Sequence, residues 1–294
     1  MKYSVVIATY NRNRLLLKNL ESLRNQTIPK DDYEIIIVND GSSDSTESDI
    51  KFFTGENPDL DMRYFRQKNS GPSKARNRGI REARGEIIFL TDDDCIPPEN
   101  WIETLAQKYS LHPEVAGVGG WYYYPQESLK NWFVRYSIPM FLFYYQKFMS
   151  DGEINNNLFR TNPAGNTSNM SYRKQILDLV NGFDEKLNFV GMVDWELKKR
   201  IMDLGYPLLY ISEPVLHLKP LGMKEIIRKY FNRGRGQYHM VQKNPELFFA
   251  YKPRLFLREK VKNVKGFDKQ IFYLMGFVEY IFRYLGWIYQ WFTY

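Results

Sequence analysis

The sequence predicts an α/β protein built around a mostly parallel sheet, and two observations lead to this prediction. Short apolar runs rich in Val, Ile and Phe alternate with helically spaced apolar residues through roughly the first 120 residues. The runs are apolar at nearly every position, which is typical of parallel strands covered by helices on both faces. A chain of 294 residues is long enough to bury a hydrophobic core of this kind.

The alternating part contains four expected strands with helices between them. The strands are Tyr3–Thr9, Glu34–Asn39, Met62–Gln67 and Glu86–Thr91. The helices are Arg14–Leu23, Lys74–Ala83 and a segment near Trp101–Tyr109. Asp40-Gly41-Ser42-Ser43 has the composition of a turn, and Asp44 or Ser45 suits the N-cap of a further helix.

The second half of the chain is less regular. We expect helices at Asp194–Leu204 and Met223–Val241, a strand at Leu208–Ile211, and a polar loop over Asn162–Lys174. The aromatic stretch Trp121–Phe148 leaves two interpretations open, a helix packed against the rest of the protein and a membrane-facing element.

The cysteine content and the lengths of the apolar runs indicate the cellular compartment of the protein. Cys95 is the single cysteine, which excludes an intrachain disulfide framework and a Cys-based zinc site. The first apolar run is too short for a signal peptide, and a run of about 18 apolar residues does not occur. We therefore expect a reducing, cytoplasmic setting.

Positive charge is concentrated late in the sequence. The chain carries 41 Lys and Arg against 34 Asp and Glu, a net charge of +7. Between Lys224 and Lys265, twelve Lys and Arg face three Glu, an excess of nine, so the rest of the chain is slightly acidic. We call Lys224–Lys265 the basic stretch. It favours an anionic partner: a membrane surface, nucleic acid or a phosphorylated substrate.

The C-terminal segment Ile271–Phe292 is almost entirely aromatic and aliphatic. On a helix, its exceptions form one stripe at spacings of three and four residues: Gly276, Glu279, Arg283, Gly286 and Gln290. One interpretation is a helix packed through its broad apolar face on the enzyme or on a partner protomer of a homo-oligomer. The other is an interfacial helix on an anionic membrane, attracted through the basic stretch. Nucleic acid is not expected, because a recognised binding motif is lacking.

An acidic turn, Asp92-Asp93-Asp94, directly follows the fourth expected strand. Three adjacent carboxylates repel one another unless a cation compensates, and hard oxygen ligands suit Mg²⁺ or Mn²⁺. The alternative is a solvated loop that caps the next helix. Thr9-Tyr10-Asn11 and Asp40-Gly41-Ser42 follow two other strands, so all three clusters are expected at the ligand-binding edge of the sheet. Neither a dinucleotide-binding Gly motif nor a P-loop is present.

Six segments, in this order, together resemble the family 2 glycosyltransferases, which have the GT-A fold. They are VVIATYNR (Val5–Arg12), IIIVNDGSSDST (Ile35–Thr46), NSGPSKARNRGI (Asn69–Ile80), EIIFLTDDDCIPP (Glu86–Pro98), NTSNMSYRK (Asn166–Lys174) and GFDEKLNFVGMVDWELKKRI (Gly182–Ile201). The resemblance implies transfer of a sugar from a nucleotide-sugar to an acceptor, with inversion. It also implies a glycosyltransferase domain at residues 1–220, with a nucleotide-binding half (1–120) and an acceptor half (121–220). Residues 221–294 are then a basic, aromatic, helical extension.

The resemblance also implies residue roles. The nucleotide-sugar contacts that it implies are Ala8, Thr9, Tyr10, Asp40, Arg76, Asn77, Asp92 and Asp93. Asp40, which by itself is equally a turn residue, corresponds to an aspartate that contacts the base. Asp93, Asp94 and His217 correspond to metal ligands. Asp92 and Asp94 form a literal DxD, whereas alignment on the following Pro-Pro favours Asp93. A lone histidine after an apolar strand is also explained by packing alone.

Asp194 corresponds to the usual catalytic base, and its alternative role is a helix N-cap. Val193 stands where the family commonly has Glu, and Glu196 is the next candidate base. The expected protein is a metal-dependent enzyme at the inner face of the cell membrane, acting on a glycan or a lipid-linked saccharide. One rival is a degenerate nucleotide-sugar-binding or membrane-binding protein, supported only by Val193. The other, a sugar nucleotidyltransferase, should have an N-terminal Gly-rich loop, which IATYNRNR lacks.

Overall fold

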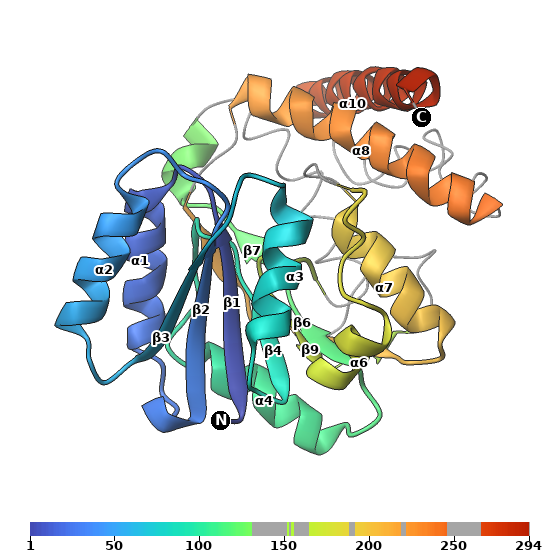
Figure 1. Ribbon diagram of the computed structural model, residues 1–294. Coiled ribbons are helices and arrows are strands. Elements are labelled where there is room, and N and C mark those ends of the chain that lie inside the picture. Colours follow the sequence, from blue (N-terminus) through green and yellow to red (C-terminus); the bar gives the residue numbers. More distant parts are fainter. Residues whose placement is uncertain are drawn as a thin grey trace.

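The computed structural model describes residues 1–130, 152, 154–155, 165–187, 192–218, 222–245 and 266–293. These residues form an α/β fold in which helices cover both faces of a central sheet (Figure 1). The described part of this sheet has eight strands in the order β3-β2-β1-β4-β9-β6-β10-β8. All pairs among β3, β2, β1 and β4 are parallel, whereas β9 and β8 run antiparallel to their neighbours. The predicted fold class is confirmed.

The strands of the central sheet are β1 (Tyr3–Thr9), β2 (Tyr33–Asn39), β3 (Asp61–Arg66), β4 (Ile87–Leu90), β6 (Gly117–Gly119), β8 (Ile154–Asn155), β9 (Met170–Arg173) and β10 (Leu208–Tyr210). The helices are α1 (Asn13–Arg24), α2 (Thr46–Glu56), α3 (Pro72–Glu82), α4 (Trp101–Leu111), α6 (Lys174–Leu179), α7 (Val193–Asp203), α8 (Met223–Lys243) and α10 (Gly266–Thr293), with short 3₁₀ helices η1 (Lys30–Asp32) and η2 (Gln126–Lys130).

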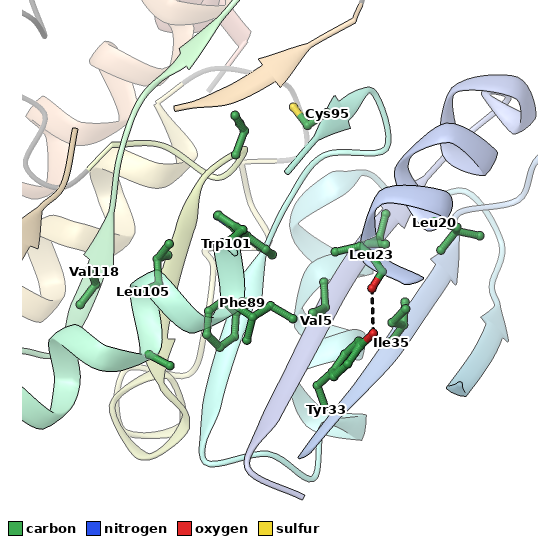
Figure 2. Close-up of a cluster of buried hydrophobic side chains, with 14 of the residues drawn as sticks. Val5, Leu20, Leu23, Tyr33, Ile35, Phe89, Cys95, Trp101, Leu105 and Val118 are labelled. Carbon is green, nitrogen blue, oxygen red and sulfur yellow. Dashed lines mark hydrogen bonds between the residues drawn. The ribbon is translucent and has the colours of Figure 1, made fainter. Parts of the chain in front are cut away.

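The alternation of side chains along β1 divides the core into two layers. Val5 and Ile7 face the layer formed with α1, α2 and α4, and Val6 faces the layer formed with α3, α6 and α7. Figure 2 shows part of the first layer, where the Tyr33 hydroxyl donates a hydrogen bond to the carbonyl of Leu23 at 2.8 Å. Because both faces of β1 are buried, its residues from Val5 to Ala8 are all apolar, and the polar Thr9 follows at the carboxyl end.

One expected loop is a central strand. The prediction of a polar loop over Asn162–Lys174 is wrong at β9, which lies between β4 and β6. Its Ser171 is fully buried, donates a hydrogen bond to the Val118 carbonyl at 2.9 Å and shares another with the Tyr109 hydroxyl at 2.9 Å. Partners distant in the sequence therefore satisfy the polar groups that made the segment look like a loop.

Two further expectations concern aromatic segments. The described part of Trp121–Phe148 contains a two-residue strand, β7 (Tyr122–Tyr123), and η2 rather than one helix, and residues 131–148 lie outside the described residues. The C-terminal helix exists as α10. It packs on α8 through the stripe that contains Glu279 and Arg283, together with Met275 and Trp287, while most of its large apolar residues are exposed.

A small second sheet lies beside the carboxyl edge of the large one. It consists of β5 (Cys95–Ile96), β11 (Val215–His217) and β7, in the order β5-β11-β7. In the antiparallel pairing of β5 with β11, Cys95 lies opposite His217. This register brings a histidine from late in the chain to the acidic turn after β4.

Candidate active site

The carboxyl ends of β1, β2 and β4 meet at one edge of the central sheet, and each leads into polar residues (Figure 1). Thr9 ends β1, Asp40 follows β2, and the acidic turn Asp92–Asp94 follows β4 after Thr91. The Thr9 hydroxyl donates a hydrogen bond to Asp93 at 2.8 Å, so the first and third clusters are in direct contact.

Asp92 is held by two side chains from other elements. Nη2 of Arg76, on α3, lies 2.8 Å from one of its oxygens, and the Ser168 hydroxyl donates to the other at 2.8 Å. Burial by itself raises the pKa of Asp92, but Arg76 and Ser168 outweigh it and hold that pKa below the ordinary value. Asp92 is therefore a charged, fully engaged carboxylate.

Asp93 and Asp94 share one cationic partner. Nη1 of Arg12 lies 2.9 Å from an oxygen of each carboxylate, and both aspartates are buried. Burial raises the pKa of Asp93 to about 6, and burial together with the neighbouring Asp92 raises the pKa of Asp94 to about 6. Arg12 opposes both shifts without cancelling them. Two buried carboxylates with one shared guanidinium retain an excess of negative charge, which suits an additional cation.

His217 lies beside Asp94, one of these two carboxylates. Its Nε2 lies 3.6 Å from Oδ1 of Asp94, and its ring packs against Tyr122 and Tyr124 at centroid distances of 5.3 and 4.9 Å. The possible ligand atoms of Asp94, Cys95 and His217 all lie within 4.8 Å of one another. Burial raises the pKa of the Cys95 thiol well above its usual value, so the imidazole and the carboxylates are the better hard-cation ligands.

Asp40 shapes the loop that leads into α3. One of its oxygens accepts hydrogen bonds from Gln67 Nε2 at 2.8 Å and from the Ser70 amide at 3.0 Å, and the other accepts from the Gly71 amide at 2.9 Å. The first oxygen already accepts two hydrogen bonds, so only the oxygen that accepts from Gly71 has a lone pair left. Contact between Asp40 and a nucleotide base therefore stays a prediction, whereas its hydrogen bonds to the loop before α3 are observed. Tyr10, at the neighbouring loop, is 48% exposed and accessible to a ligand.

Asn77, one residue after Arg76, points away from the acidic turn. Its Nδ2 donates to the Phe183 carbonyl at 2.8 Å, and its Oδ1 accepts from the Phe183 amide at 2.7 Å. The side chain thus fixes the loop that precedes α7. Ala8, the last of the expected nucleotide-contacting residues, is partly buried against the α3 side of the sheet.

Asp194 lies in the first turn of α7, which follows Met192 in a left-handed conformation (φ 62°). Its Oδ1 accepts a hydrogen bond from the Trp195 amide at 3.0 Å. One turn further, the fully buried Lys198 donates to the Gly165 carbonyl. Burial lowers the pKa of Lys198 to about 8, although the Asp194 carboxylate acts to raise it. Asp194 therefore lies at the N-terminal end of a helix and near enough to Lys198 for the two charges to interact.

Lys198 and Ser168 connect α7 with the acidic turn, and the sequence analysis missed both. Lys198 binds the start of the loop at residues 165–169, and Ser168 in the same loop binds Asp92. The signal for Lys198 was present: it is four residues after Asp194, on the same helix face, among buried apolar residues. Ser168 gave no such signal, because its contact depends on the placement of β9.

Glu196, the alternative base, is committed to ion pairs. It lies 2.7 Å from Arg200 and 3.0 Å from Lys243 of α8. Asp184, in the loop before α7, lies 2.8 Å from His239 and 2.7 Å from Lys243. The hydrogen bond with His239 is the main cause that holds the pKa of Asp184 far below its usual value. These contacts dock α8 on α7 and its preceding loop.

A mostly parallel sheet with a carboxylate cluster and a histidine at its carboxyl edge defines an α/β protein of the GT-A class. The fold is similar to that of the mannosyltransferase PcManGT from Pyrobaculum calidifontis, solved with GDP-Man and Mn²⁺. That match has a TM-score of 0.67 at 16% identity and covers 98% of this chain and 86% of the other. It is also similar to residues 1–349 of Staphylococcus aureus TarS, solved with UDP-GlcNAc. There the TM-score is 0.59 at 18% identity, over 94% of this chain and 79% of the other.

The sequence profile of Glycosyl transferase family 2 matches residues 4–180. The chain belongs to this family and is a glycosyltransferase. Among curated relatives, the glycosyltransferase AglE of Haloferax volcanii is 28% identical over 237 residues, which are 80% of this chain and 72% of AglE. The probable glycosyltransferase YdaM of Bacillus subtilis is 27% identical over 254 residues, and the match covers 85% of this chain but only 59% of YdaM. Within the described ranges, every helix is too short or too polar to cross a membrane.

Proposed function

We propose that this glycosyltransferase moves the sugar of a nucleoside-diphosphate sugar to an acceptor hydroxyl by a single displacement with inversion, assisted by Mn²⁺ or Mg²⁺. The observation that carries the proposal is the approach of Asp94 Oδ1 to the His217 imidazole at 3.6 Å at the carboxyl edge of the sheet, beside Asp93, which shares Arg12 with Asp94. The complexes of PcManGT with GDP-Man and Mn²⁺ and of TarS with UDP-GlcNAc support it by analogy.

The donor set fits a divalent cation. Asp93 and Asp94 supply oxygen atoms whose charge Arg12 compensates only in part. His217 supplies a nitrogen, a ligand that Mn²⁺ accepts more readily than Mg²⁺, so Mn²⁺ is the expected ion of the two. When bound, the cation would neutralise charge on the leaving diphosphate. The residues that would hold it are Asp93, Asp94 and His217.

The nucleotide is assigned to the edge formed by the ends of β1 and β2. Ala8, Thr9 and Tyr10 border this edge, and one oxygen of Asp40 has a lone pair left for a base or ribose hydrogen bond. Arg76, which lies against Asp92, and Arg12 hold positive charge beside the carboxylates. Both guanidinium groups can therefore form bidentate hydrogen bonds with the diphosphate oxygens.

The transfer step is assigned to Asp194. The acceptor oxygen forms a bond to the anomeric carbon while the bond from that carbon to the diphosphate oxygen breaks, and the hydroxyl proton passes to the Asp194 carboxylate. Attack opposite to the leaving group inverts the configuration. The Trp195 amide in the first turn of α7 donates a hydrogen bond to Asp194 Oδ1 at 3.0 Å and so orients the carboxylate.

The acceptor is a glycan or a lipid-linked saccharide, and the enzyme makes peripheral contact with an anionic membrane at the inner face of the cell. The basic stretch supports the membrane part. Residues 1–220 carry the chemistry, with the donor in 1–120 and the acceptor in 121–220, and residues 221–294 form the extension.

The test is a thermal-shift panel of nucleoside diphosphates with and without Mn²⁺, since a ligand that binds the native state raises the melting temperature. One preferred nucleotide, stabilising only with the cation, supports the donor site. The anomeric configuration of the product, read by NMR, then checks inversion. Equal shifts with and without the cation for every nucleotide would contradict the metal assignment.

A further inference from the structure

Helix α10 packs on α8 through its polar stripe. Glu279 is only 7% exposed and lies 2.9 Å from Arg283 on its own helix and 3.7 Å from Arg233 on α8. Nε of Arg283 donates to Gln237 at 3.2 Å. A little further along, Nε of Arg235 donates to Gln290 at 2.9 Å. The seam between the two helices therefore combines hydrogen bonds and ion pairs with apolar packing, in which Trp287 of α10 contacts Tyr238 of α8.

Two glycines let the helices approach backbone to backbone. A Cβ at Gly234 would lie 1.8 Å from the Arg283 carbonyl oxygen, and a Cβ at Gly286 would lie 1.9 Å from that of Phe231. Neither position accepts any side chain without separating the helices. The seam thus determines which face of α10 points toward the protein and which points away.

The outward face of α10 is apolar from Tyr273 to Phe292. The exposed large apolar residues on it are Tyr273, Leu274, Phe277, Tyr280, Ile281, Tyr284, Leu285, Trp291 and Phe292. We call these nine residues the outer face. Phe277, Trp291 and Phe292 are 58%, 62% and 78% exposed. The only charged residues between positions 270 and 293 are Glu279 and Arg283, and both lie in the seam. This arrangement is the reverse of an ordinary surface helix.

Charge identifies the partner of this face. The basic stretch carries nine excess positive charges and leads along the chain into α10. In a two-fold dimer through the outer face, the same patch meets itself, and the second copy offers the basic stretch no anionic surface. An anionic bilayer instead attracts the basic stretch while its interface accepts the aromatic rings of Tyr and Trp.

Helices α8 and α10 lie at the same end of the molecule as the active-site edge. Figure 1 shows α8 and α10 at the end toward which β1 and β2 run. His239 and Lys243 of α8 bind Asp184 in the loop before α7, the helix that carries Asp194. Helix α8, which forms one side of the seam, therefore also contacts the loop before α7, on the proposed acceptor side of the site.

We infer that α10 lies in the surface of an anionic bilayer with its outer face inserted among the lipids, and that the acceptor is consequently a lipid-linked saccharide presented from that bilayer. This inference rests on the proposed function and narrows its acceptor to one class. An α-helix of this length lies flat over about 40 Å of the interface. The seam keeps the catalytic domain attached while the opposite side of the helix is in lipid.

The first experiment is co-flotation of the full chain with vesicles of phosphatidylcholine and phosphatidylglycerol across a salt series. Phe277→Gln combined with Leu285→Gln should weaken vesicle binding by about tenfold or more per side chain, at low and high salt alike, because apolar burial is not screened. The matched control is Phe52→Gln combined with Leu111→Gln. These residues are 72% and 69% exposed on α2 and α4, and the control should bind as the unmodified chain does.

Charge reversal at Arg254, Arg258, Lys260 and Lys262 should weaken binding most at low salt, because the Debye length is only ~8 Å at physiological salt. Failure of the unmodified chain to float with anionic vesicles at low salt would overturn the inference. So would a dimer in solution that the double variant of the outer face converts to a monomer, because the face then belongs to a second copy.

The acceptor class is tested by comparing one saccharide on a polyprenyl chain in vesicles with the same saccharide on a short water-soluble linker. Transfer should favour the vesicle-bound acceptor, and the outer-face variant should lose that preference while its melting-temperature shift with nucleoside diphosphate and Mn²⁺ stays the same. Equal transfer to both acceptors would contradict the inference. Because flotation needs neither donor nor cation, its outcome is independent of whether the donor-site proposal holds.

Discussion

The hydroxyl of Thr9 and the carboxylate of Asp93 are 84 residues apart in the sequence and 2.8 Å apart in the structure. The hydrogen bond joins the end of β1 to the turn after β4 and orients one carboxylate of the pair that Arg12 bridges. With one oxygen directed at Thr9 and the other at Arg12, Asp93 is positioned before any ligand arrives. The proposed cation site is therefore rigid on the Asp93 side, and Asp94 makes the contact with His217.

We expect Asp93→Asn and Asp94→Asn each to abolish Mn²⁺-dependent binding of nucleoside diphosphates while leaving the protein folded. Each change removes a charged oxygen ligand and relieves repulsion within the pair. Binding is measured by calorimetry with and without Mn²⁺, and folding by circular dichroism. Asp203→Asn, at a side chain 51% exposed on α7, is the matched control. Unchanged Mn²⁺-dependent affinity in both site variants would exclude them as ligands.

We expect Asp194→Asn to reduce turnover by about 10²–10⁴-fold, the usual contribution of a positioned general base. The affinity for the nucleoside diphosphate should stay the same, because Asp194 acts on the acceptor. Glu196→Gln is the comparison: it breaks ion pairs with Arg200 and Lys243 and should lower stability more than turnover. If Glu196→Gln abolishes transfer and Asp194→Asn does not, the two roles are reversed.

Asp184 should make the stability of the α8 docking depend on pH. Its pKa is held below the ordinary 3.8 chiefly by the hydrogen bond with His239, so the folded state favours the charged form. That contribution is complete above about pH 4 and is lost as pH falls through the lower, folded-state pKa. Asp184→Asn should therefore lower the free energy of unfolding by about 2 kcal/mol at pH 7.

The same substitution should cost progressively less as the pH falls below 3.8. Urea denaturation at several pH values measures the difference between the two proteins. Asp178→Asn, which breaks a pair with Lys174 at a side chain 51% exposed, should cost less than about 0.5 kcal/mol. An effect of Asp184→Asn that is the same at pH 7 and pH 3 would show that charge does not cause it.

We expect substitution by alanine to have opposite effects on stability at a glycine in the seam between α8 and α10 and at a glycine outside it. Gly286→Ala places a methyl group 1.9 Å from the Phe231 carbonyl oxygen and should destabilise the protein by about 1–3 kcal/mol or release α10. Gly55→Ala, on α2, meets no atom within 4 Å and should be neutral or stabilise by up to about 1 kcal/mol. Melting temperatures and limited proteolysis distinguish the two. Equal behaviour would mean that α10 does not pack closely on α8 in solution.

The sequence by itself determined the part of the fold that local patterns specify. The apolar runs of β1, β2 and β4 are buried on both faces, so their strand character and their polar carboxyl ends are readable from composition. The positions of Thr9, Asp40 and the acidic turn at one edge follow from that parallel arrangement. The stripe on α10 was likewise visible as a periodicity of three and four residues.

Only the tertiary structure decided what depends on partners distant in the chain. The strand β9 forms because β4 and β6 pair with it and satisfy its polar groups. The four residues of β9 do not by themselves predict a strand. The meeting of Cys95 with His217 comes from the register of β5 and β11. The orientation of α10 depends on Gly234 in another helix, because periodicity defines two faces of a helix but does not tell which one packs. Backbone contact at the glycines and ion pairs at Glu279 and Arg283 turned the polar face inward and left the aromatic face outside.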